Sequence, residues 1–218
     1  MKKIKNIYDL LSSAILSGIC ISIGCIVFLK TGGIIGAILF CFGLITVTHY
    51  KFDLFTGKCG FIENLFDFRN LLFVLFGNII GCFIVSLAIR YSQIDLIDKS
   101  MEVFNKRLEI GLLPCGFMGI GCGFIMTTAV QFARYNKYLP LLFGVPVFIL
   151  CGFLHSIADA FYILMLPYDY LFNNTNIILK IYGMIVLGNF IGCNLVRIIK
   201  MEKYEYLIDM INERKHGK

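Results

Sequence analysis

One histidine stands in the middle of an apolar run long enough to cross a membrane. His155 lies within residues 144–161, which are mostly aliphatic and aromatic. An ionisable side chain is costly at bilayer depth and usually marks an ion or proton pathway, unless it is only a hydrogen-bonded core residue. Asp159 follows four residues later, so on a continuous helix it either orients the imidazole or has a packing or inter-subunit role. The run predicts a protein that moves a small charged solute past His155.

A second polar interruption, at residues 50–58, holds three further candidates. Lys51 and Asp53 either pair with each other, leave Lys51 as a positive charge beside the pathway, or belong to a solvated loop. Thr56 either hydrogen-bonds the solute or caps a half-helix that resumes at Cys59. These alternatives stay open at the level of the sequence.

Composition indicates a polytopic membrane protein with a single domain, residues 1–218. Of the 218 residues, 58% are hydrophobic and only 16% are charged, and the mean hydropathy is +0.81. At roughly 20 apolar residues per crossing, about six spans fill the chain. The nine cysteines show no paired spacing typical of a zinc site or a disulfide framework, so we expect buried packing residues, no metal and no cofactor.

Six apolar runs can be recognised, and the second and fifth are interrupted. The runs are 10–29, 33–49, 71–91, 110–133, 139–154 and 177–196. We expect the second helix to resume at 59–66 and the fifth to resume at 160–166. Irregular backbone is tolerated at membrane depth only where protein or a water-filled cavity satisfies it. Two corresponding breaks therefore predict one shared pathway.

A short internal repeat divides the chain into two halves of three spans. Gly-Asn-Ile-Ile-Gly at 77–81 recurs as Gly-Asn-Phe-Ile-Gly at 188–192. An odd number of spans per half inverts the second half relative to the first. The glycines themselves are interpreted as sites of close helix approach, with each Asn bonding across the contact. The fold class predicted is all-α, with six helices in two inverted repeats and broken second and fifth helices.

Lysine and arginine in the loops predict the orientation. With the N-terminus inside, the cytoplasmic side carries twice as many Lys and Arg residues near span ends and in the tail as the opposite side. This favours a cell-membrane protein whose residues 1–9 and 197–218 are cytoplasmic and flank the six-span core 10–196. The net charge of +6 is then a topology signal and not a nucleic-acid footprint.

Several segments together resemble the formate/nitrite transporter family. They are residues 36–45 followed by Asp-Leu-Phe-Thr-Gly at 53–57, the two Gly-Asn segments at 77–81 and 188–192, and Gly-Phe-Leu-His-Ser-Ile-Ala at 152–158. Each motif alone is weak, but their ordered combination is specific and covers nearly the whole chain. The resemblance implies an aquaporin-like protomer in a homopentamer, with one pore per protomer for formate, nitrite or hydrosulfide.

The resemblance also implies roles for individual residues. Thr56 matches the family's loop threonine and His155 its central histidine, and Arg107 matches a basic residue at the extracellular mouth of some members. The residues that match the apolar constrictions are Phe40, Leu44, Leu54, Phe55 and Phe148. The chain departs from the family pattern at Lys51-Phe52, Gly123, Leu154 and Asp159.

Two other functions remain to be weighed against an anion channel. A pore for small neutral solutes would also use six spans and two broken helices, but the chain lacks the paired Asn-Pro-Ala motifs of such pores. A membrane-embedded enzyme built on His155 with Asp159 or a cysteine would need a second histidine at membrane depth or a cofactor motif, and the sequence has neither. We therefore expect a channel or transporter and not an enzyme.

Overall fold

The computed structural model describes residues 6–62 and 64–200, and within them every regular element is a helix. Four of the described helices are long and apolar enough to cross a membrane. They are α1 (Ile7–Thr31), α4 (Leu65–Arg90), α6 (Leu112–Ala133) and α10 (Thr175–Cys193). Each covers one of the predicted apolar runs. The segments 1–5 and 201–218, which include most of the predicted cytoplasmic tail, lie outside the described residues.

Two shorter apolar helices, α2 (Gly33–His49) and α7 (Leu139–Leu150), match the second and fifth runs. After α2, the first break (residues 50–54) leads to α3 (Phe55–Lys58) and the 3-10 helix η1 (Cys59–Phe61). After α7, the second break (residues 151–155) leads to α8 (Ser156–Leu164). The predicted restarts at residues 59 and 160 are therefore wrong by four residues each.

Three short helices complete the described chain, and the apolar runs predicted none of them. They are α5 (Ile97–Ile110), α9 (Tyr168–Asn173) and α11 (Leu195–Lys200). In α5 the apolar side chains of Ile97, Met101, Phe104 and Leu108 recur at helical spacing, so a single face of the helix packs on the protein. Gly111, with φ 84°, separates α5 from α6 in a conformation that a side chain would strain.

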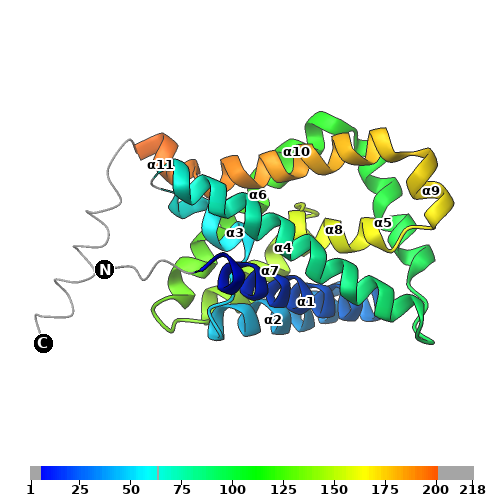
Figure 1. Ribbon diagram of the computed structural model, residues 1–218, viewed down its shortest axis with the longest axis horizontal. Helices are drawn as coiled ribbons and strands as arrows, with labels where there is room; N and C mark the ends of the chain where they lie inside the picture. Colours follow the sequence, from blue (N-terminus) through cyan, green and yellow to red (C-terminus); the bar gives the residue numbers. More distant parts are fainter. Residues whose placement is uncertain (1–5, 63, 201–218) are drawn as a thin grey trace, which may run out of the picture.

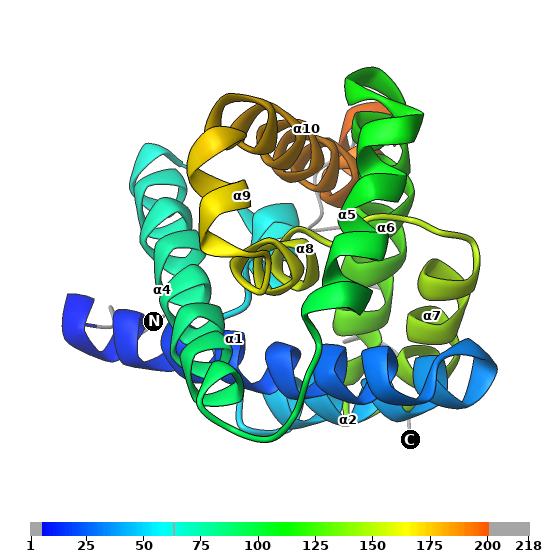
Figure 2. The ribbon, with the colours of Figure 1, turned by 90° about the vertical axis from the view of Figure 1, so that its right-hand side faces the viewer.

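The long helices surround α8. Figure 1 shows α1 and α2 along one side, α10 along the other, and α3 and α8 between them. The view along the bundle shows α8 in the middle with α3 behind it, encircled by α1, α4, α10, α6 and α7 (Figure 2). In the same view α5 crosses one end of the bundle. Both helices that follow a break are thus enclosed by the other helices.

Glycines allow two helix pairs to approach closely. A Cβ atom on Gly81 of α4 would lie 2.2 Å from Ile15 O of α1, and one on Gly188 of α10 would lie 2.2 Å from Gly116 O of α6. Any larger residue would force these backbones apart. The structure therefore confirms the interpretation of the repeated glycines as sites of close helix approach.

Candidate functional site

Asn189 of α10 holds the second break in place. Its Nδ2 donates to Leu154 O at 2.8 Å and to Gly119 O at 2.9 Å, and its Oδ1 accepts from Ser156 N–H at 2.8 Å. The side chain is fully buried. One amide thus satisfies a carbonyl before His155 and an N–H after it, which fixes where α8 begins.

Asn78 of α4 holds the first break by the same pattern. Its Nδ2 donates to Asp53 O at 2.9 Å and to Ala14 O at 2.8 Å, and its Oδ1 accepts from Phe55 N–H at 2.9 Å. This explains why the helix resumes at Phe55. The sequence signal for both amides was the Gly-Asn repeat, which predicted a contact between helices but not its link to the breaks.

His155 occupies the N-cap of α8 and is 98% buried. Its Nδ1 accepts from Ala158 N–H at 3.2 Å, and its Nε2 lies 3.0 Å from Thr56 Oγ1. A backbone N–H can only donate, so Nδ1 carries a lone pair and the neutral ring has its proton on Nε2. Nε2–H then donates to Thr56, whose own hydroxyl hydrogen is left for another acceptor.

Thr56 contacts His155 and does not cap the helix. It is the second residue of α3, and the N-cap residue Leu54 has no side-chain capping bond. The expected cap of a helix starting at Cys59 is therefore wrong, because α3 begins earlier and points the hydroxyl at the imidazole. The contact joins the helices that follow the two breaks, at residues 99 positions apart in the sequence.

Asp53 pairs with Lys58, the last residue of α3, and not with Lys51 as one interpretation predicted. Its backbone N–H donates to Ser13 Oγ at 3.0 Å, so both the side chain and the main chain are anchored. Lys51 is exposed and adopts φ 58° in the turn after α2.

Asp159 does not bond to the imidazole. Its Oδ1 accepts from Arg107 Nε of α5 at 2.9 Å, and the side chains are 4% and 17% exposed, respectively. Only its backbone N–H contacts His155, at the carbonyl oxygen. The orienting role predicted for Asp159 is therefore wrong, because α5 supplies a stronger, charged partner. Placing Arg107 this close to the histidine needed the position of α5, which the apolar runs missed.

A cavity of about 490 Å³ opens beneath α5, and His155 lies in its wall. We refer to it as the α5 cavity. Phe40 and Phe148 also line it, and their rings meet edge to face with centroids 6.1 Å apart. Phe148 stacks on His155 at 5.8 Å. The charged residues in the wall are Lys99, Glu102, Lys106, Arg107 and Asp159. Cations outnumber acids there, which favours an anion.

A second cavity, of about 640 Å³, opens at the other end of α2. We refer to it as the α6 cavity, since the end of α6 forms one wall. Leu54 and Val130 are among the apolar residues that line it. Its charged residues are Lys51, Asp53, Lys58 and Arg134, and the exposed His49 also lines it. Cations outnumber acids here too.

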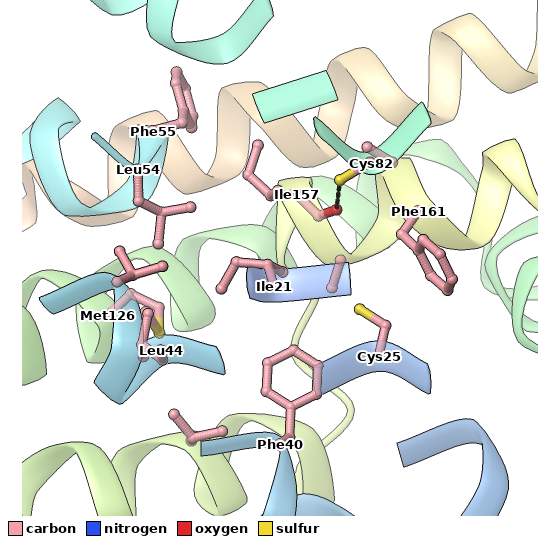
Figure 3. Packing of buried hydrophobic residues seen from close by; sticks show 14 of the residues in the cluster. Ile21, Cys25, Phe40, Leu44, Leu54, Phe55, Cys82, Met126, Ile157 and Phe161 are labelled. Atoms are coloured by element: carbon pink, nitrogen blue, oxygen red, sulfur yellow. Dashed lines mark hydrogen bonds between the residues drawn. The ribbon is translucent and has the colours of Figure 1, made fainter. Parts of the chain in front are cut away.

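Apolar side chains separate the two cavities. Phe40 faces the α5 cavity and Val47 faces the α6 cavity, and seven residues of helix span about 10 Å. Leu44 lies between them on the same helix face and is buried. It gathers with Leu54 and Met126 in the core, whereas Phe55 lies apart from them (Figure 3). Leu44 and Phe55 line neither cavity.

The departures at Gly123 and Leu154 have local structural reasons. A Cβ atom on Gly123 would lie 2.3 Å from Asn189 O, so α6 and α10 leave no room there for a side chain. Leu154 is buried in an apolar cluster with Phe104 of α5, away from the α5 cavity. Neither residue adds a polar group to the site.

Known proteins resemble this chain in sequence and in fold. The sequence matches the family model described as "Formate/nitrite transporter" over residues 1–201. A solved structure described as "Pentameric formate channel with formate bound" superposes with a TM-score of 0.76 at 22% identity, covering 94% of this chain and 98% of that one. An "FNT family ion channel" gives 0.75 at 18% identity, with 88% of both chains covered. No curated protein matches the sequence significantly.

Proposed function

Because this membrane protein belongs to the formate/nitrite transporter family, whose members are transporters and not enzymes, we propose that it conducts small monovalent anions of weak acids. The observation that carries the proposal is the pair of cation-rich cavities that approach a buried His155–Thr56 pair from opposite ends of α2. Formate, nitrite and hydrosulfide are the candidate substrates. The pathway runs through a single protomer, since one chain supplies both cavities.

The proposal includes the architecture of the pathway. The six crossings are α1, α2 with α3, α4, α6, α7 with α8, and α10, arranged as two inverted halves in a homopentamer of the cell membrane with both termini in the cytoplasm. The matching hydrogen bonds from Asn78 and Asn189 to the two breaks support two equivalent halves. The pentameric assembly of the similar formate channel supports the ring.

His155 lets an anion cross the apolar layer. A bare anion is expensive to move between Phe40, Leu44 and Leu54, so it must be neutralised or strongly hydrogen-bonded there. In the neutral state, Nε2–H donates to Thr56 Oγ1, and the Thr56 hydroxyl hydrogen is the donor left for the anion. A second proton can bind only at Nδ1, where it displaces the bond from Ala158 N–H. Protonation of His155 is thereby coupled to release of the α8 cap.

Uptake by proteoliposomes tests the proposal. Initial rates for formate, nitrite and hydrosulfide are measured between about pH 5 and 8, a window that brackets the ordinary histidine pKa of about 6.5. Empty liposomes correct for passage of the free acids, and swelling in glycerol tests a neutral-solute pore. We expect protein-dependent anion uptake and no glycerol permeation. Glycerol permeation without anion uptake would refute the proposal.

A further inference from the structure

Arg107 presents two guanidinium nitrogens that have no acceptor among the described residues. Its Nε donates to Asp159 Oδ1 at 2.9 Å, and that is its one side-chain hydrogen bond within residues 6–62 and 64–200. The side chain lines the α5 cavity and is 17% exposed. Nη1 and Nη2 are therefore available to a solute in the cavity that also contains His155.

The position of this guanidinium is held from both sides. Asp159 is buried in α8, one turn after His155, and its carboxylate engages only the Nε edge. On α5, Phe104 is packed in the apolar cluster, and Cys115 Sγ donates to Arg107 O at 3.5 Å. A donor pair held in advance loses little entropy when a ligand binds.

The geometry of a guanidinium selects among anions of equal charge. Its parallel N–H groups match two oxygen atoms in one plane, as in a carboxylate, and the resulting bidentate pair is stronger than a single bond. Formate and nitrite each present two such oxygens. Hydrosulfide has one acceptor atom and gains only the charge attraction. A lysine ammonium at this position would not discriminate in this way.

We infer that Arg107, oriented by Asp159, is a specificity-determining residue of the α5 cavity, where it binds planar two-oxygen anions in preference to hydrosulfide. The inference rests on the proposed function, since it concerns the anion before it reaches His155. Asp159 is a departure from the family pattern. In this role it orients the guanidinium of Arg107, and the positive charge of Arg107 compensates its carboxylate.

The test compares two substitutions. Arg107→Lys keeps the positive charge and removes the pair of parallel N–H donors, whereas Lys106→Gln removes an exposed charge from the same cavity. In proteoliposomes, Arg107→Lys should raise the apparent KM for formate and nitrite about tenfold, the effect of losing one charge-assisted hydrogen bond. The KM for hydrosulfide should change by less than about twofold. Lys106→Gln should shift all three anions by one common factor, because it alters only the screened field.

A binding measurement separates this inference from the proposed function. Formate should raise the melting temperature of the detergent-solubilised wild-type protein, and this shift should be lost in Arg107→Lys, whose own melting temperature without formate shows that it is folded. A wild-type protein that transports no anion but keeps the Arg107-dependent shift would refute the channel and retain the site. Equal KM factors for formate and hydrosulfide in Arg107→Lys, or a formate shift that survives the substitution, would overturn the inference.

Discussion

The two breaks share one backbone scaffold and differ in the residue placed on it. In each, a buried Asn donates to one carbonyl of the break and one of a neighbouring helix, and accepts from the N–H two residues further along. The residue between these two bonds is the N-cap of the following helix. It is Leu54 in the first break and His155 in the second.

That single difference divides the roles of the breaks. Leu54 has no side-chain capping bond and adds an apolar wall to the α6 cavity. His155 caps its own helix and faces the α5 cavity. Thr56, two residues after Leu54, reaches across to the imidazole. The first break therefore contributes the hydrogen-bond partner and the second break contributes the titratable group. The backbone scaffold is repeated in the two breaks, but the chemical groups that it holds are not.

The largest effect is expected from removing the shared scaffold. Asn78→Leu and Asn189→Leu each remove three hydrogen bonds, and in each variant one carbonyl and one N–H of the break lose their Asn partner. At about 1–3 kcal/mol for each buried unsatisfied group, each variant should lose at least about 2 kcal/mol of stability. Thermal unfolding and assembly in mild detergent measure this loss.

The control for the scaffold is Asn176→Ala, at an exposed position on α10. It should leave unfolding unchanged within the error of the measurement. If one of the two Asn→Leu variants were as stable as the wild type while the other unfolded, the two breaks would not be equivalent scaffolds.

Substitution of His155, which has no counterpart in the first break, should preserve the fold and change transport. In His155→Asn the amide oxygen can still cap α8, since Asn is a favoured N-cap residue. The protonated fraction of a histidine falls as the pH rises from 5 to 8. Wild-type uptake should therefore rise as the pH falls across this range, and His155→Asn should lose this dependence.

Two other groups near the cavities could imitate such a pH profile. His49 is exposed in the α6 cavity, so His49→Gln serves as the matched control and should keep the wild-type profile. Glu102 in the α5 cavity does not interfere, because its hydrogen bond to Lys106 lowers its pKa and it stays ionised throughout the assay range. Identical pH profiles of uptake for wild type and His155→Asn would show that His155 is a packing residue of the core and takes no part in transport.

An intermediate effect is expected from the apolar layer between the breaks. Phe148→Ala removes the ring that stacks on His155 and meets Phe40, and Leu44→Ala thins the layer between the cavities. Both variants should admit larger solutes, such as acetate or glycerol, in swelling assays. Phe172→Ala, an exposed position on α9, is the control. Unchanged solute selectivity in both variants would remove these residues from the pathway.

The sequence predicted the long helices and the approximate positions of both breaks, because apolar length and Gly-Asn spacing are local signals. It placed the helix restarts four residues late, at 59 and 160. The true starts depend on Asn78 and Asn189, which come from other helices and bond to Phe55 and Ser156. Such long-range bonds leave no periodicity near the break itself.

The partners of the charged residues were harder to predict. Asp53 and Asp159 each had a plausible neighbour nearby in the sequence, Lys51 and His155. The structure gives each a different partner, Lys58 and Arg107. For Asp53 the positive φ of Lys51 turns the chain, and for Asp159 the partner lies on α5, an amphipathic helix hidden in a segment without an apolar run. Resemblance placed Arg107 near the mouth but could not supply its contact.

The smallest effect separates a free charge from a paired one at the first break. Lys51 is exposed, lines the α6 cavity and has no ion-pair partner in the described part of the chain, so Lys51→Gln should leave stability unchanged. Because salt screens exposed charges within about 8 Å, the apparent KM for formate should rise only about twofold, and less at high salt. Lys58→Gln instead removes an ion pair of the buried Asp53 carboxylate, so it should lower the melting temperature and add little further change in KM. Uptake at two ionic strengths, with unfolding measured on the same preparations, distinguishes the two lysines. A stability loss in Lys51→Gln equal to that in Lys58→Gln would show that both lysine charges stabilise the first break. The two breaks would then differ in what stabilises them, as well as in the residue at the N-cap.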